Sequence, residues 1–192
     1  MVKKRTGPLE PGVSHPDTAQ ELIAMAEADQ AMRRGDSWNP DLDRRHTLRL
    51  REIVVAIGWP VRSKVGVEAA RMAWLLAQHA DQDPDFQREC LHLMKDAPEG
   101  DVEKQNIAYL EDRVRLKDRR PQLYGTQFRL NHAGDLVPEQ IEDPAHLDER
   151  RLKAGLGPFS EYEKLMRDYA PPPQAQAHIS PPTATSRRGE RA

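Results

Sequence analysis

The sequence predicts a mainly α-helical protein, with a single domain of about six or seven helices and one small β-hairpin. Through the first two thirds of the chain, apolar residues recur at spacings of three and four, as on one face of a helix. Asn39-Pro40 and Asp83-Pro84 each combine a helix-capping residue with proline at the first helical position. After Pro121 the pattern changes to that of two short strands around a glycine-containing loop. A chain of 192 residues is long enough to bury one core of ordinary size.

Each predicted helix ends at glycine, proline or a charged segment, where the helical pattern cannot continue. Gly155 followed by Leu156 is typical of a Schellman-type cap, in which a glycine with positive φ ends a helix. Ser160 and Glu163 have the spacing of a capping box that begins the last helix. We expect helices at residues 17–35, 40–57, 63–79, 84–94, 102–120, 144–154 and 160–169, and strands at 122–130 and 136–141.

The two ends of the chain differ in composition from its middle. Residues 1–16 contain glycine, proline and charge without periodicity, and we expect them to form a flexible arm. Residues 170–192 are rich in proline, alanine and arginine, cannot build a core, and are expected to be disordered. The single helical domain is therefore expected at residues 17–169, with its hairpin near 122–141.

The composition argues against several classes of protein. With 29 basic and 31 acidic residues the net charge is −2, so no overall field attracts nucleic acid or an anionic membrane. The chain has no signal-peptide pattern and no run of about 18 apolar residues. Its one cysteine, Cys90, cannot form an internal disulfide and is expected to act as a small apolar side chain. We expect a cytoplasmic protein without nucleic-acid or membrane partners, and leave its oligomeric state open.

Several polar residues fall where the helical pattern predicts a buried face. Asp29, His46 and His79 interrupt apolar stripes, while Gln87 and Asp112 lie at the edges of such stripes. Burying these groups without partners is unfavourable, so we expect them to cluster around one another or around a ligand. A carboxylate from Asp112 or Asp29 beside His79 would orient the imidazole and raise its pKa, as in a general acid–base pair.

Less specific explanations apply to the same residues. A histidine at the end of a helix often does no more than bond the last carbonyl groups. Asp29 with Arg33, and Asp112 with Arg113, could equally form structural ion pairs. His46 could be a core histidine whose hydrogen bonds are satisfied.

The segment QLYGTQ, residues 122–127, combines strand-like residues with Gly125. A glycine in this context indicates a bulge or the close approach of another segment. Gln122, Tyr124, Thr126 and Gln127 offer hydrogen-bond donors and acceptors without an acid, which suits an amide or carboxylate ligand. An edge strand with solvated side chains is the alternative.

Common catalytic motifs are absent from the sequence. It contains no phosphate-binding loop, dinucleotide fingerprint, zinc-protease motif or nucleophile elbow. His79, His92 and His132 lack the spacing of metal ligands, although ligands from separate helices stay possible. We therefore expect neither a metal nor an organic cofactor.

Short motifs follow one another in a defined order: Asp29-Gln30 with Arg33, Gly58-Trp59-Pro60, Gln78–Asp81, Phe86-Gln87, Tyr109-Leu110 with Asp112-Arg113, Gln122 with Tyr124–Gln127, Pro138 with Ile141 and Asp143, and Arg150-Arg151 with Gly155-Leu156 and Pro158. In this order, over about residues 20–169, they resemble a family of bacterial proteins of unknown function. The resemblance implies that the polar residues form one constellation, and it gives no reason to expect a metal or an organic cofactor.

The sequence therefore favours a small cofactor-independent enzyme that performs acid–base chemistry on a polar small molecule or peptide. Hydrolysis, isomerisation and cyclisation are equally compatible with this pattern. The alternatives are a non-catalytic module that binds a ligand or protein through the same pocket, and a purely structural network. We expect a site between helices, formed by the catalytic residues His79 and Asp112 and the binding residues Asp29, Gln30, Arg33, Gln87, Arg113, Gln122, Tyr124, Thr126 and Gln127.

Overall fold

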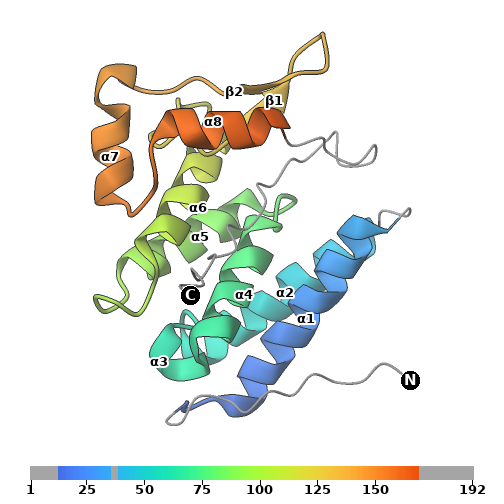
Figure 1. Ribbon diagram of the computed structural model, residues 1–192. Helices are drawn as coiled ribbons and strands as arrows, with labels where there is room; N and C mark the ends of the chain where they lie inside the picture. Colours follow the sequence, from blue (N-terminus) through green and yellow to red (C-terminus); the bar gives the residue numbers. More distant parts are fainter. Residues whose placement is uncertain (1–12, 36–38, 169–192) are drawn as a thin grey trace, which may run out of the picture.

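The computed structural model describes residues 13–35 and 39–168 (Figure 1). Most of the predicted arm, the end of the last predicted helix at Tyr169 and all of the predicted tail lie outside these residues. The elements are α1 (Pro16–Arg34), α2 (Pro40–Ile57), α3 (Arg62–Val65), α4 (Val67–Gln78), α5 (Pro84–Lys95), α6 (Lys104–Lys117), β1 (Phe128–Leu130), β2 (Leu136–Pro138), the 3-10 helix η1 (Pro144–His146), α7 (Leu147–Lys153) and α8 (Phe159–Asp168).

Helices α1 to α6 form the larger part of the molecule, with α4 at its centre. Seven successive residues of α4, from Met72 through Gln78, are buried, and so is the C-cap residue His79, because α1, α2, α5 and α6 all pack around this helix. The main apolar core includes Leu22 from α1, Leu50 from α2 and Phe86 from α5. A helix that is apolar on nearly all sides belongs in the interior of a helical domain. Helix α4 is therefore the element against which the others are placed.

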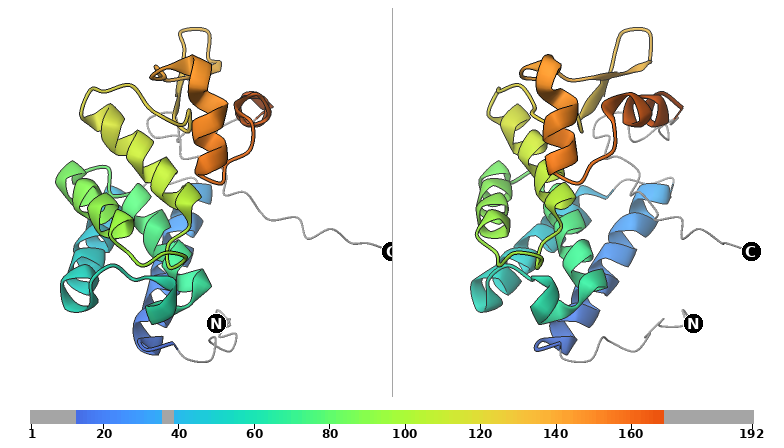
Figure 2. Two further views of the ribbon diagram at one scale, coloured as in Figure 1. Left: turned by 90° about the vertical axis from the view of Figure 1, so that its left-hand side faces the viewer. Right: turned by 60° about the vertical axis from the view of Figure 1, so that its left-hand side comes forward.

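The hairpin, α7 and α8 form a smaller layer at one end of the molecule, next to α6, as both views in Figure 2 show. One small core joins Phe128 and Leu136 of the hairpin to Tyr162 and Met166 of α8. Tyr109 of α6 packs against this core and against the main core as well. Helix α6 therefore connects the two parts of the protein.

The predicted fold class is confirmed: the described residues form a mainly α-helical structure with one two-stranded antiparallel sheet. They contain eight α-helices, more than the six or seven expected, in part because Gly66 separates α3 from α4. Gly66 has a φ of 83°, which favours glycine and interrupts the predicted helix at residues 63–79. The predicted Schellman cap is confirmed, since the Leu156 amide donates to the Arg151 carbonyl at 2.9 Å and Gly155 has a φ of 74°.

Two local predictions were wrong. The strands predicted at 122–130 and 136–141 are three residues each, and residues 122–127 form a loop. The capping box is also absent, because Ser160 lies inside α8. The carboxylate of Asp148 on α7 instead accepts a hydrogen bond from the Phe159 amide at 2.7 Å and holds the first turn of α8.

Candidate functional site

The C-terminal end of α4 meets the C-terminal half of α1 at a buried histidine–aspartate pair. His79 follows the last residue of α4, and its Nδ1 lies 2.8 Å from Oδ2 of Asp29. Asp29 is 1% exposed and His79 is 5% exposed. Asp29 faces inward because it continues the α1 stripe of Leu22, Met25 and Ala26. Of the two carboxylates predicted as alternative partners of His79, the structure places Asp29 there.

Arg33 joins this pair to a second carboxylate. Its Nε lies 3.1 Å from Oδ1 of Asp29 and 3.0 Å from Nδ1 of His79, and its Nη2 lies 2.9 Å from Oδ1 of Asp43 on α2. The predicted pairing of Arg33 with Asp29 is confirmed. Gln30 adds a hydrogen bond from Nε2 to Oδ2 of Asp29 at 3.1 Å. We call Asp29, Arg33, Asp43 and His79 the α1–α4 cluster.

The two carboxylic acids of this cluster differ in their affinity for protons. Burial acts to raise the pKa of Asp29, but the hydrogen bond and charge of His79 and the charge of Arg33 outweigh it, so the pKa is well below its usual range. Burial raises the pKa of Asp43 to about 6, against the opposing charge of Arg33. Two acids in one site whose environments move their pKa values apart are a common feature of acid–base catalysts.

Burial also lowers the pKa of His79, and this outweighs the hydrogen bond and charge of Asp29, which act to raise it. The expectation that a neighbouring carboxylate would raise the imidazole pKa is therefore not met, because desolvation dominates. The lowered pKa favours the neutral form of His79, and the ionised Asp29 favours a proton on Nδ1. In this tautomer Nδ1 donates to Asp29 and cannot also accept a hydrogen bond from Nε of Arg33, and the lone pair of the ring is on Nε2.

A second polar group continues from the first across α4 to α6. Arg113 donates from Nε to Oε1 of Gln78 at 2.8 Å and from Nη1 to both carboxylate oxygens of Asp81 at 2.9 Å. Gln87 on α5 donates from Nε2 to the carbonyl groups of Ala77 and Gln78. The two glutamines thereby hold the last turn of α4 in place, directly beside His79.

Two buried polar atoms in this second group lack hydrogen bonds to the described residues. They are Nε2 of Gln78 and Oε1 of Gln87. Gln78 is 3% exposed and Gln87 is fully buried. Buried amide atoms of this kind usually bond an ordered water or a ligand, so they mark the neighbourhood of His79 as one that could accept a further polar molecule.

Asp112 does not belong to the α1–α4 cluster and instead supports a loop. Its carboxylate accepts hydrogen bonds from the amide groups of Leu123, Tyr124 and Thr126, at 2.6 to 3.2 Å, and from the Thr126 hydroxyl at 2.9 Å. Gln122 closes the same loop, because its Oε1 accepts from the Gln127 amide and its Nε2 donates to the Gln127 carbonyl. These contacts use the oxygens of Asp112 to organise residues 122–127, which we call the Asp112 loop.

The predicted site residues thus lie in three groups. Asp29, Gln30, Arg33 and His79 converge at α1 and α4; Gln87 and Arg113 adjoin them; and Asp112, Gln122, Tyr124, Thr126 and Gln127 make up the Asp112 loop and its support. Sequence reasoning missed Asp43, Gln78 and Asp81. Asp43 could have been found from its spacing to Thr47, Leu50 and Val54, which are buried on the same face of α2. His46, expected on that stripe, is half-buried, and its Nδ1 has no hydrogen-bond partner in the described structure.

Within residues 13–35 and 39–168, no three side chains of His, Cys, Asp or Glu converge in a way that would hold a metal ion. None of the helices in these ranges combines the length and apolar character needed to cross a bilayer.

The architecture and the buried polar groups define a small helical protein with an internal charged cluster. Residues 16–171 match the family model described as "Family of unknown function (DUF6624)", so the chain belongs to this family. Neither the curated proteins nor the solved structures include a match to the chain.

Proposed function

We propose that the protein is a cofactor-independent enzyme that performs acid–base chemistry on a polar small molecule or peptide at the α1–α4 cluster. The observation that carries this proposal is the buried Asp29–His79 hydrogen bond of 2.8 Å, joined through Arg33 to Asp43. A neutral imidazole whose Nδ1–H is held by a carboxylate has its Nε2 lone pair available as a base.

Each member of the cluster has a distinct part in this proposal. His79 takes a proton from the substrate through Nε2. Asp29 fixes the tautomer and stabilises the imidazolium that forms. Asp43, with its pKa of about 6, is protonated in about a tenth of molecules at pH 7 and can donate or exchange a proton. Arg33 keeps the two carboxylic acids together. Asp112, predicted as catalytic, is assigned here to the support of its loop.

A non-catalytic binding module is the second candidate, and the enclosure of the cluster favours it. Asp29 already accepts hydrogen bonds from Gln30, Arg33 and His79, and the His79 ring is almost completely covered. The more accessible charges near it are Arg33 and Asp81, whose side chains are 17% and 14% exposed. A ligand bound by these groups would not need His79 as a base.

Ligand screening followed by turnover measurement separates the two candidates. Purified protein is screened by thermal shift against metabolites and peptides, and each stabilising compound is then incubated with wild type and with His79→Gln. If the protein is an enzyme, wild type converts at least one of these compounds, and the variant does so at least about 100-fold more slowly, the usual range for loss of a general base.

His92→Gln is the matched control, because His92 is an exposed histidine on the neighbouring helix α5. It should convert the compound at the wild-type rate. Binding without conversion by wild type would refute catalysis and favour the binding module. A large loss of melting temperature in His79→Gln, with no stabilising compound in the library, would indicate a structural network.

A further inference from the structure

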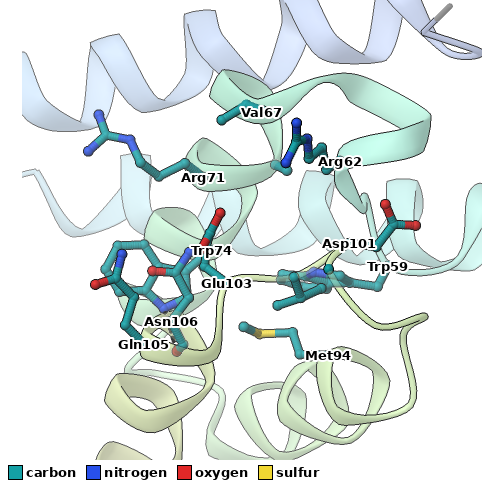
Figure 3. A pocket seen from close by; sticks show the side chains of 13 residues that line it. Trp59, Arg62, Val67, Arg71, Trp74, Met94, Asp101, Glu103, Gln105 and Asn106 are labelled. Carbon is teal, nitrogen blue, oxygen red and sulfur yellow. Dashed lines mark hydrogen bonds between the residues drawn. The ribbon is translucent and has the colours of Figure 1, made fainter. Parts of the chain in front are cut away.

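A hollow of about 510 Å³ lies beside the N-terminal half of α4, next to α3 and the segment that leads into α6. Its lining contains none of the residues of the α1–α4 cluster or of the Asp112 loop. Two indole rings, of Trp59 and Trp74, contribute to its wall, and Figure 3 shows Met94 on one side of them and Arg62 and Arg71 on the other. A volume of this size is typical of sites for small molecules.

The start of α6 supplies polar groups to this hollow. Glu103 at the N-cap of α6 makes no capping hydrogen bond with its side chain, and the first turn contains no acidic residue. Glu103, Gln105 and Asn106 all line the hollow. The N-terminus of a 14-residue helix carries partial positive charge and amide groups that need acceptors. An anion bound here would accept hydrogen bonds from these amide groups and interact favourably with the partial positive charge.

Asn106 provides an independent sign of a ligand. Its side chain lines the hollow although the residue is only 8% exposed, and in the described structure the side-chain amide has no hydrogen-bond partner. Its backbone carbonyl is occupied by the indole N–H of Trp74 at 2.9 Å. A side-chain amide that opens into a cavity without a described partner is suited to a polar ligand atom.

The charges around the hollow favour a ligand with a single negative charge. The guanidinium groups of Arg62 and Arg71 form no ion pair with described residues. Of the two carboxylates in the lining, Asp101 is held by the Ser63 amide and hydroxyl, at 3.2 and 2.7 Å. Glu103 makes no described ion pair. Asp101 keeps its negative charge in these hydrogen bonds, so the lining carries two guanidinium groups and two carboxylates. The guanidinium groups, which form no described ion pair, can still pair with an anion, and the balanced charge of the lining favours a monoanion over a more highly charged ligand.

We propose that this hollow is a binding site for a planar aromatic monocarboxylate. The aromatic body packs between Trp59 and Trp74, and the carboxylate lies at the N-terminus of α6, where it accepts hydrogen bonds from Asn106 and from the arginine side chains. The proposal does not depend on catalysis at His79, because the two sets of residues do not overlap.

The test uses 2-naphthoate and its neutral analogue 2-naphthamide as probes. Indole N–H resonances of ¹⁵N-labelled protein are followed by NMR during titration. They are assigned with Trp59→Phe and Trp38→Phe variants, Trp38 being the third tryptophan of the chain, which lies outside the described residues. We expect 2-naphthoate to shift the Trp59 and Trp74 resonances in a saturable manner. The amide, which lacks the charge, should bind at least 10-fold more weakly.

The double variant Arg62→Gln, Arg71→Gln should bind 2-naphthoate at least 10-fold more weakly than wild type. Both residues are exposed, so the fold should be kept, and the dispersion of the amide spectrum checks this. Arg44→Gln on α2 is the matched control, since Arg44 is an exposed arginine outside the hollow, and it should bind like wild type. Equal binding of the amide, undiminished binding by the double variant, or unmoved Trp59 and Trp74 resonances would each overturn the proposal.

Discussion

At the scale of single residues, the contacts of Asp29 determine how the α1–α4 cluster holds together. Its carboxylate accepts hydrogen bonds from His79, Arg33 and Gln30 in a site from which solvent is excluded. Removal of one member of a buried charged pair leaves the other without compensation and destabilises a protein by about 3–5 kcal/mol. The cluster should therefore contribute to stability whatever its role in catalysis.

We predict that Asp29→Asn lowers the free energy of unfolding by about 2–4 kcal/mol, because the guanidinium group of Arg33 stays in the cluster without the negative charge of Asp29 that compensates it. Urea denaturation followed by circular dichroism measures this change. Asp17→Asn, an exposed change in the first turn of the same helix, should alter stability by less than about 0.5 kcal/mol. Equal, small effects of both variants would show that the buried contacts of Asp29 contribute little.

The raised pKa of Asp43 leads to a prediction about pH. The folded protein keeps the Asp43 proton up to about pH 6, whereas the unfolded chain releases it near pH 4. In this window the folded state therefore binds more protons, and Asp43 makes the unfolding free energy fall as pH rises. Asp43→Asn removes this contribution, so the variant should gain about 1–3 kcal/mol relative to wild type between pH 4 and pH 7.

Urea titrations of both proteins at pH 4, 5, 6 and 7 give the difference directly. Taking the difference cancels the contributions of groups common to both proteins, such as His79. Asp41→Asn, an exposed change in the first turn of the same helix, should show no such trend. A constant difference between Asp43→Asn and wild type across this range would mean that Asp43 has an ordinary pKa.

At the scale of secondary-structure elements, the Asp112 loop depends on a glycine as much as on a carboxylate. Gly125 has a φ of 66°, and a Cβ atom there would lie 2.7 Å from a ring carbon of Phe159 on α8. Gly134, in the hairpin loop, has a φ of 87° but no atom within 4 Å of such a Cβ. Alanine substitutions at the two glycines therefore separate the cost of backbone strain from the cost of a clash with α8.

We predict that Gly134→Ala costs about 1 kcal/mol, the strain of a positive φ, whereas Gly125→Ala costs at least about 2 kcal/mol more because α8 must move. Urea denaturation measures the two losses. A matching loss in both variants would show that Phe159 moves aside easily. In that case the close approach inferred from the sequence at Gly125 would not constrain α8.

The sequence predicts secondary-structure elements well where a local signal, such as a capping residue, exists. It predicts them poorly where contacts with side chains distant in the sequence determine the structure. The side chains of Asn39 and Asp83 cap helices as expected. The Asp112 loop was expected to be a strand because its residues are strand-like. It is a loop because Asp112, on α6, accepts hydrogen bonds from amide groups that a strand would pair with its neighbour. Asp43 follows the spacing of the buried residues of α2, but only its ion pair with Arg33 shows that it belongs with Asp29 and His79. Local signals predict helices, while partners across the structure decide loops and charged clusters.

At the scale of the whole molecule, α6 holds the layer of hairpin, α7 and α8 against the helical body. Tyr109 lies edge-on to Trp74, with ring centres 5.9 Å apart, and edge-on to Tyr162, at 6.2 Å. It contacts all three apolar clusters of the described structure. The cluster around Phe128 and Tyr162 is much smaller than the main core, so the layer depends on such shared contacts.

We predict that Tyr109→Ala allows the hairpin layer to open while the helical body stays folded. Regions with few buried apolar contacts unfold locally at lower free energy than the core. Native-state hydrogen exchange, measured by NMR, should show the amides of β1 and α8 exchanging at least about 10-fold faster in the variant, with those of α4 changed less. Ile107→Ala, on the same helix against the main core alone, should accelerate α4 at least as much as α8. Equal acceleration of α4 and α8 in Tyr109→Ala would show instead that the two parts unfold as one cooperative unit.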